Sequence, residues 1–186
     1  MKEKILRNVL FFTILMMITA CAAEVSEESA EPVRDTIQVN PAPAEVPQPA
    51  RQFTTYHNQR FNFCFIYLED EFKPSGEAQN SDGNIFYSSD GKMKVAVYGY
   101  NNVLDHNIDE LLQFDLKNNP DKKILKRELT SGYYMISGNI GKVAFIEKRV
   151  IAGSDIKVIQ AEFPGEERAA FEHKASVIVD DFPKCE

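Results

Sequence analysis

Apolar and polar positions alternate over most of the chain beyond residue 60, as they do in β-strands that bury one face. In Phe61–Leu68, aromatic side chains fill every second position. Six further segments have the composition and length of strands: Asn84–Ser88, Lys92–Tyr100, Ile124–Leu129, Tyr133–Gly138, Val143–Ile151 and Ile156–Phe163. Short turn sequences such as Ser89-Asp90-Gly91 separate them, so neighbouring strands should run antiparallel.

Two segments have helical periodicity instead. The first spans about residues 108–116, and Asp115 is the one polar residue in its apolar stripe. Either Asn107 or Asp105 can cap its start. The second follows residue 165 and ends near residue 181, with an apolar stripe of Phe171, Ala175, Ile178 and Phe182. The pattern therefore predicts an α+β fold, a twisted antiparallel sheet of about seven strands flanked by helices.

The N-terminal segment has the features of a lipoprotein signal peptide. Three basic residues precede an apolar run, Val9–Ala20, and Ile18-Thr19-Ala20 leads directly into Cys21. At 12 residues the run is too short for a transmembrane helix, which needs about 20, and it has the length of a signal-peptide core. We predict a signal peptide over residues 1–20, with Cys21 as the lipid-bearing N-terminus.

A change of composition marks a linker over residues 22–52, which with Cys21 forms the segment 21–52. Five of the nine prolines lie in it, no glycine or aromatic residue does, and acids outnumber bases six to two. Such a segment buries too little apolar surface to offset the entropy of ordering it. It is predicted to be a flexible tether rich in proline and glutamate.

Residues 53–186 form one predicted domain of ordinary size. It holds 16 Lys and Arg against 21 Asp and Glu, a net charge of −5, which argues against nucleic acid as a partner. Five basic residues gather in Lys117–Arg127, interrupted by Asp121. We interpret this cluster as a solvated face.

Cys64 and Cys185 are the cysteines that remain once Cys21 carries lipid. Outside the cytoplasm such a pair is a candidate disulfide. The alternative is a buried Cys64 on a strand and a free thiol at Cys185.

Candidate catalytic and metal-binding residues are sparse. His57, His106 and His173 lie far apart, and none has the spacing of a metal motif. Asp105-His106 is better explained by a loop or a helix cap. The sequence therefore predicts no metal, no cofactor and no enzyme, with a hydrolase assembled only in three dimensions as the remote alternative.

The order of several segments resembles a known family. The segments are Tyr56–Phe65, Ser81–Phe86, Val95–Gly99, Tyr133–Gly138 and a terminal helix closing on Asp181-Phe182. Together they resemble bacterial secreted proteins and lipoproteins of the PsbP-like fold, over nearly all of residues 53–186. This resemblance implies a central antiparallel sheet flanked by helices and a binding or assembly role without catalytic residues. It transfers no metal or photosystem role, because no functional position of the photosynthetic members is matched.

These features predict a lipid-anchored protein of the bacterial cell envelope. The expected position is the outer membrane facing the periplasm, with the cell surface as the alternative. We expect a non-catalytic module that binds an envelope protein or assists assembly. The aromatic residues also raise the alternative of a carrier for a lipid or small hydrophobic ligand, although a simple core explains them as well.

The lipid anchor is open to a direct test. The variant Cys21→Ser should not be processed as a lipoprotein, so it should appear as soluble or unprocessed protein when cell fractions are separated and blotted. A variant that is still processed and remains on the membrane like the wild type would contradict the prediction.

Overall fold

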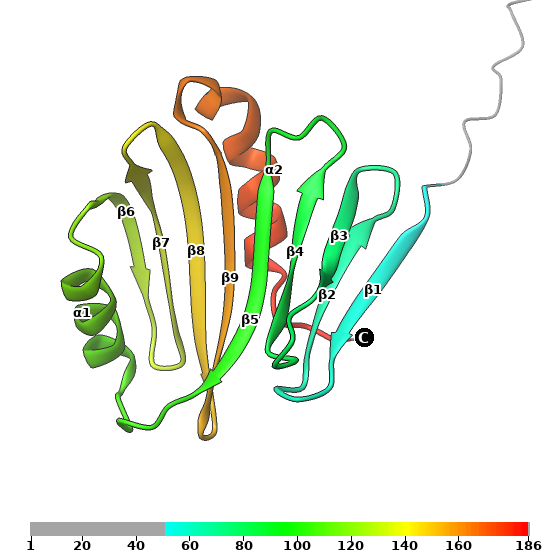
Figure 1. The fold of residues 1–186 in the computed structure, drawn as a ribbon. Coiled ribbons are helices and arrows are strands. Elements are labelled where there is room, and N and C mark those ends of the chain that lie inside the picture. Colours follow the sequence, from blue (N-terminus) through cyan, green and yellow to red (C-terminus); the bar gives the residue numbers. More distant parts are fainter. Residues whose placement is uncertain (1–50, 186) are drawn as a thin grey trace, which may run out of the picture. The chain divides into compact units, whose positions relative to one another are not determined.

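The computed structural model describes residues 51–185, and Figure 1 shows their arrangement. The predicted signal peptide, the lipidation site Cys21 and residues 22–50 of the linker lie outside the described residues. The elements are β1 Phe53–Asn58, β2 Phe63–Leu68, β3 Phe72–Glu77, β4 Gly83–Ser88, β5 Lys94–Asn101, α1 Ile108–Asn118, β6 Lys122–Leu129, β7 Tyr133–Ile140, β8 Val143–Ala152, β9 Asp155–Pro164, the short 3₁₀ helix η1 Gly165–Glu167, and α2 Arg168–Asp180. Within residues 51–185, no helix is long and apolar enough to span a membrane.

Seven strands form one antiparallel sheet in the order β3-β4-β5-β9-β8-β7-β6. At its centre, β9 pairs with β5 on one side and with β8 on the other, where ten consecutive pairs run from Val143↔Pro164 to Ala152↔Asp155. The predicted α+β class with an antiparallel sheet is thus confirmed.

The membership of the sheet differs from the prediction in two places. β2, predicted as part of the main sheet, pairs instead with β1 in a separate two-stranded ribbon. β3, which the sequence did not indicate, takes the edge position beside β4. Pro74 and Gly76 conceal this strand, but an edge strand tolerates both residues because one side of it makes no ladder.

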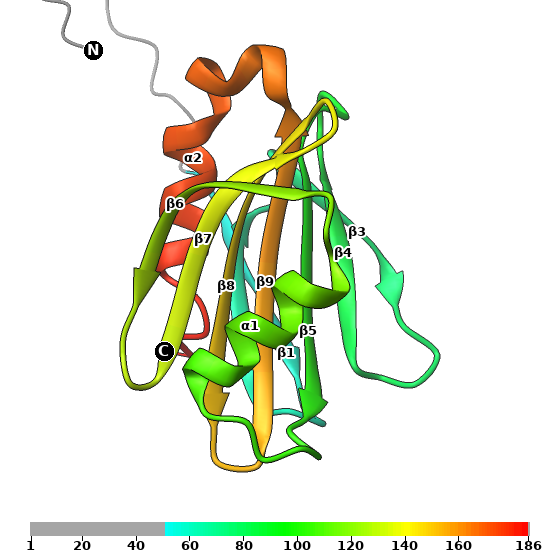
Figure 2. The ribbon, with the colours of Figure 1, turned by 90° about the vertical axis from the view of Figure 1, so that its left-hand side faces the viewer.

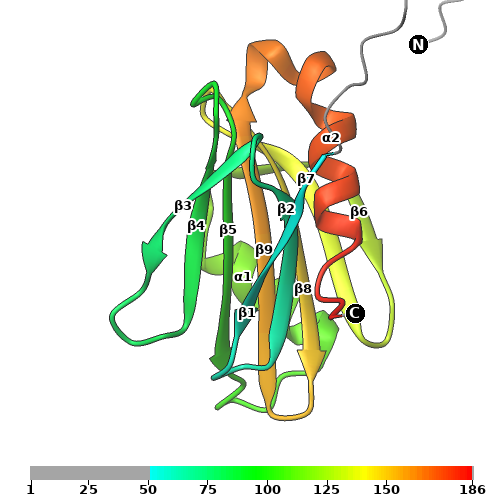
Figure 3. The same cartoon turned by 90° about the vertical axis from the view of Figure 1, so that its right-hand side faces the viewer.

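Side chains of the large sheet divide between two faces, as the alternation along β8 shows. Ala144 and Ile146 belong to the core shared with α2 and the β1–β2 ribbon, whereas Phe145 belongs to the core under α1. α1 crosses one face of the sheet (Figure 2), and the ribbon and α2 cover the other (Figure 3). Helices therefore flank the sheet on both sides, as predicted.

The aromatic residues of β2 form part of the larger core. Phe63 and Phe65 are buried, and the Phe65 ring lies 4.8 Å from that of Phe86 on β4. Phe182 closes the end of this core after α2, with its ring 5.5 Å from that of Phe63. These side chains make up a packed core, which is the simpler of the two explanations that the sequence allowed.

Asn107 caps α1, so the second candidate, Asp105, is not the cap. The Asn107 side chain accepts hydrogen bonds from the backbone N–H groups of Asp109 and Glu110 at 3.0 and 3.1 Å. The Glu110 carboxylate in turn accepts from the backbone N–H of Asn107 at 2.9 Å. This reciprocal pair is a capping box, and it fixes the point at which the loop before α1 becomes helix.

A disulfide joins Cys64 on β2 to Cys185 near the C-terminus, 121 residues apart in sequence. The pairing predicted from the sequence is therefore present, and the alternative of two free thiols does not hold. In the chain-entropy account, closing a loop of this length stabilises the fold by roughly 5 kcal/mol.

Gly138 on β7 is required by a close approach of the neighbouring strand. A Cβ atom at this position would lie 2.1 Å from the carbonyl oxygen of Lys123 on β6. We expect Gly138→Ala to lower the free energy of unfolding by about 1–3 kcal/mol, because the two strands would have to separate locally. Urea denaturation measures the change.

Gly132 provides the matched control, because a Cβ there would meet no atom within 4 Å. Gly132→Ala should leave the stability within about 0.5 kcal/mol of the wild type. Equal losses in the two variants would contradict the steric explanation for Gly138.

Candidate functional site

Four oppositely charged side chains meet between α1 and the large sheet. Asp115 comes from α1, Lys122 from the first position of β6, and Glu147 and Arg149 from the face of β8 that α1 covers. Their side chains are 2 %, 4 %, 0 % and 11 % exposed respectively. We refer to these four residues as the buried ion cluster.

Each charge in the buried ion cluster lies within contact distance of both opposite charges. Lys122 Nζ lies 2.7 Å from Asp115 Oδ2 and 2.9 Å from Glu147 Oε2. Arg149 Nη2 lies 2.5 Å from Asp115 Oδ1, and Arg149 Nε lies 2.9 Å from Glu147 Oε1. Two cations and two anions thus neutralise one another, which a water-poor site requires.

Tyrosine side chains complete the hydrogen bonds of the cluster. The Tyr134 hydroxyl donates to Glu147 Oε1 at 3.2 Å, and Arg149 Nη1 donates to the Tyr100 hydroxyl at 3.1 Å. Within residues 51–185, every fully buried polar side-chain atom has a hydrogen-bond partner. The cluster is therefore closed and offers no unpaired group for binding or catalysis.

Burial sets the protonation of the tyrosines around the cluster. It raises the pKa of Tyr98 to about 12, and it also raises the pKa values of Tyr134 and Tyr100. Burial alone would lower the pKa of Arg149, but the Glu147 carboxylate and the neighbouring tyrosines together outweigh it, so the net shift is upward. The phenols stay neutral and the guanidinium stays charged at physiological pH, as a structural role requires.

The loop that leads into α1, residues 102–107, is held rigidly; we call it the α1 loop. The Asn102 side chain donates to the backbone carbonyl of His106 at 2.8 Å and accepts from the His106 N–H at 3.1 Å. The Asn102 N–H donates to the carbonyl of Ser154 in the β8–β9 turn at 2.7 Å. Asp105 has a positive φ of 49°, which completes the tight course of the loop. The backbone is thus fixed both to itself and to the sheet.

This fixed loop carries apolar side chains into solvent. Val103 is 83 % exposed and Leu104 is 60 % exposed. Phe114 on α1 is 46 % exposed, and its ring lies 5.2 Å from the ring of His106, the loop residue two positions beyond Leu104. Single exposed apolar residues are common, but adjacent ones on an ordered loop are a feature of contact surfaces.

A shallow hollow of about 260 Å³ adjoins Val103. Arg60 of the β1–β2 turn and Asp82 of the β3–β4 turn line it together with Tyr100. Asp105, Asp109 and Glu110 follow Val103 in the chain and are all exposed. The exposed side chains of Val103 and Leu104 are therefore surrounded by polar residues, most of which are acidic.

A larger cleft of about 760 Å³ opens at the opposite end of the sheet. It is open to solvent, and three lysines line it. Two of them are paired with carboxylates at 2.7 Å, Lys92 with Glu167 and Lys94 with Glu162. The hydrogen bond from Lys92 to Glu167 raises the pKa of Lys92, so this amine is protonated and not nucleophilic. The cleft is therefore not the enclosed apolar cavity that a carrier needs.

The residues predicted as sites have distinct outcomes. Cys21 lies outside the described residues, and its lipidation stays a prediction. Cys64 and Cys185 are bonded to each other. His106 packs on Phe114, and His173 lies exposed on α2. Within residues 51–185, neither belongs to a group of potential metal ligands. His57, in contrast, lies beside the disulfide, because it pairs directly with Cys64 across the β1–β2 ribbon.

Sequence reasoning missed the buried ion cluster. The prediction of a solvated basic face is wrong for Lys122, because its ammonium group is buried between Asp115 and Glu147. Two signals were present in the sequence. Asp115 interrupts an apolar stripe, and Glu147-Lys148-Arg149 interrupts an otherwise apolar strand. Charges at buried positions need partners, so these residues were candidates for one another.

Comparison of the structure with solved proteins places the domain in a known fold. It superposes on the solution structure of cyanobacterial PsbP (CyanoP) from Synechocystis sp. PCC 6803 with a TM-score of 0.54 and 9 % sequence identity. The match covers 75 % of this chain and 97 % of that protein. The sequence matches no protein-family model and no curated protein. The predicted PsbP-like fold is therefore confirmed as a fold.

Removing one charge from the buried ion cluster should be costly. Asp115→Asn keeps the shape of the side chain but leaves two cations facing one carboxylate without water. We expect a loss of about 3–5 kcal/mol in the free energy of unfolding, measured by urea denaturation.

Asp121→Asn is the control, because Asp121 is exposed and directly precedes Lys122 in the sequence. This change should shift the stability by less than about 0.5 kcal/mol. A similarly small effect of Asp115→Asn would show that the cluster does not hold α1 in place.

Proposed function

We propose that this protein is a non-catalytic binding or assembly module of the bacterial cell envelope, held to a membrane by lipid on Cys21. The PsbP-like fold supports a module of this kind, since the resemblance in sequence already implied a binding and assembly role. The outer membrane facing the periplasm is the proposed position, with the cell surface as the alternative.

One observation supports a particular contact surface: the α1 loop exposes Val103 and Leu104 on a backbone that is already fixed. A preordered loop loses little conformational entropy when it binds, so more of the energy of burying these side chains contributes to affinity. Two aliphatic side chains that enter a partner's pocket contribute through the apolar surface that they remove from water, about 1.5–3 kcal/mol for each side chain that is fully buried.

The charges around the α1 loop favour a protein over a lipid surface as the partner. Asp105, Asp109 and Glu110 lie next to the exposed side chains, and Asp82 lines the adjoining hollow. Carboxylates at these positions would be repelled by anionic lipid. The partner that fits is a protein with an apolar pocket and a basic rim.

The position of the loop suits a tethered module. Phe53 pairs with Leu68 at the end of β1 where the described chain enters the domain. Arg60, in the turn at the other end of β1, lines the same hollow as Val103. The α1 loop therefore lies at the end of the domain away from this entry point (Figure 1).

Site-specific crosslinking tests the surface. A photoreactive amino acid replacing Val103 in whole cells should yield one discrete protein adduct, whereas the same probe at Leu125 should not. Leu125 is a fair control, because it is apolar and, at 60 %, as exposed as Leu104 but lies on β6.

The partner protein identified from the adduct is then purified by itself, and its affinity for the full chain is measured. The double variant Val103→Asp, Leu104→Asp should bind more than tenfold more weakly, because it removes the apolar surface that both side chains bury and places carboxylates in an apolar pocket. Leu125→Asp should bind like the wild type. Unchanged affinity of the double variant would disprove the α1 loop as the contact.

A further inference from the structure

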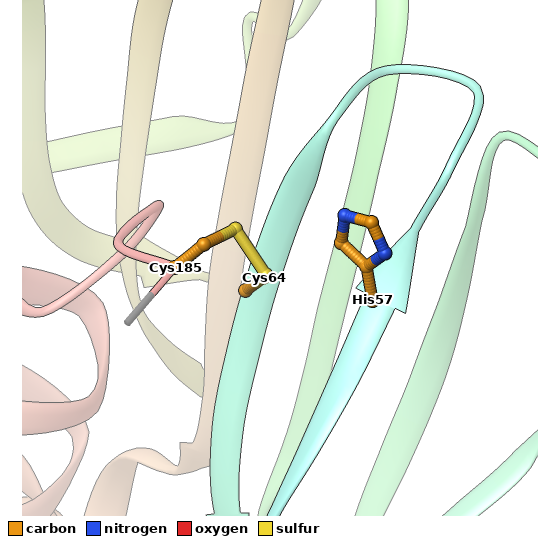
Figure 4. Close-up of side chains that lie close together, drawn as sticks. All are labelled: His57, Cys64 and Cys185. Carbon is orange, nitrogen blue, oxygen red and sulfur yellow. A yellow bond between two sulfur atoms is a disulfide. The ribbon is translucent and has the colours of Figure 1, made fainter.

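His57 and the disulfide share the outer face of the β1–β2 ribbon. His57 on β1 is the direct cross-strand partner of Cys64 on β2, so their side chains point to the same side of the ribbon. Cys185 reaches this face from the C-terminal segment that follows α2 (Figure 4). The potential metal-binding atoms of the three side chains all lie within 4.8 Å of one another.

We propose that reduction of the Cys64–Cys185 disulfide creates a metal site in which Cys64, Cys185 and His57 bind one Zn²⁺ ion. Two thiolates and one imidazole are a ligand set that zinc accepts, with a fourth position left for water or another ligand. Nitrogen and sulfur donors exclude Mg²⁺ and Ca²⁺, which require oxygen.

The chemistry balances when a dithiol acts as the reductant. It transfers two electrons to the disulfide, the S–S bond breaks, each sulfur takes up one proton, and the dithiol closes to its own disulfide. Zn²⁺ then displaces the two thiol protons into solvent and binds both sulfurs, while a lone pair of the neutral His57 imidazole completes the protein ligands.

The geometry requires only small movements. Atoms that share a tetrahedral Zn²⁺ lie about 3.7 Å apart, given Zn–S bonds of about 2.3 Å. The present 4.8 Å limit on their separations leaves about 1 Å to close for the most distant pair. The two sulfurs must move the other way, apart by about 1.6 Å from the length of a disulfide bond, about 2.05 Å. His57 and Cys64 are fixed by strand pairing, whereas Cys185 is exposed and lies beyond the end of α2. The C-terminal segment can therefore supply the adjustment.

Cys185 would also stay near the site after reduction. Phe182, three residues before it, is 3 % exposed and packs against Phe63 in the core. A thiol on so short a connection keeps a high local concentration at Cys64, which favours chelation over loss of the segment to solvent.

Zinc competition tests the proposal on the purified full chain in detergent. The protein is reduced with a phosphine, which contributes no competing thiol, and Zn²⁺ is titrated against a chromophoric chelator without oxygen. The reduced chain should bind one equivalent. The disulfide-bonded chain should not bind this equivalent. It is a matched control, because it carries the same carboxylates, which could also bind Zn²⁺. Equal binding by both forms would disprove the site.

Histidine variants separate the proposed ligand from other histidines. His57→Ala should bind Zn²⁺ at least tenfold more weakly than the reduced wild type. His173→Ala, which removes an exposed histidine from α2, should bind like the wild type. Equal affinities of His57→Ala and the wild type would rule His57 out and overturn the proposal.

Thermal unfolding covers the case in which reduction loosens the fold. A ligand that binds only the folded state raises the melting temperature. Zn²⁺ should therefore raise the melting temperature of the reduced wild type, followed by circular dichroism, and should do so much less for His57→Ala. If Zn²⁺ does not raise the melting temperature of the reduced wild type, the proposed site is disproved, just as it is if the competition experiment shows no binding.

Discussion

Helix α1 is held to the sheet where Asp115 meets Lys122 and Arg149 in a space closed to water. Burying four charges is expensive, and their mutual contacts offset the cost together with the tyrosine hydrogen bonds and a hydrogen bond of 3.0 Å from the Asn119 side chain to Asp115 Oδ1. Once they are in place, α1 cannot shift along the sheet without leaving a charge unpaired. The α1 loop is therefore fixed from two sides, by α1 beyond its C-terminal end and by the β8–β9 turn through Asn102. The buried ion cluster thus helps to determine where the exposed side chains of the α1 loop lie.

Regular alternation made most of the sheet predictable, and the exceptions have local causes. β8 and β9 were recognised because both of their faces are buried, so apolar residues dominate them. β1 was missed, because only one of its faces packs inward and the residues available there are Thr54, Tyr56 and Asn58. Without β1 the sequence shows no separate partner for β2, and the prediction that β2 belongs to the large sheet is therefore wrong. Which sheet a strand joins depends on how favourably it pairs with each possible neighbour, and the sequence of one segment does not show this.

The sites were less predictable than the fold, since they depend on contacts between distant segments. Nothing in the spacing of His57 and Cys64 suggests proximity, but a turn centred on Arg60 makes them cross-strand partners. The disulfide could be inferred, because Cys64 and Cys185 are the two cysteines that remain once Cys21 carries lipid. The exposure of the α1 loop could not be inferred, because it depends on which other segments pack over Val103 and Leu104. In the sequence these two residues look like any short apolar pair.

The position of the disulfide has a mechanical consequence for a domain pulled between residues 53 and 185, the two sides on which the chain leaves the covalent loop. Of the domain that begins at Phe53, only residues 53–63 precede the covalent loop closed by Cys64 and Cys185. Tension could peel β1 from β2, but the extension gained would stop after about 11 residues, or roughly 37 Å. The large sheet would bear little of the load while the bond is intact. Reduction would remove that stop, and the same pull would then reach the whole chain.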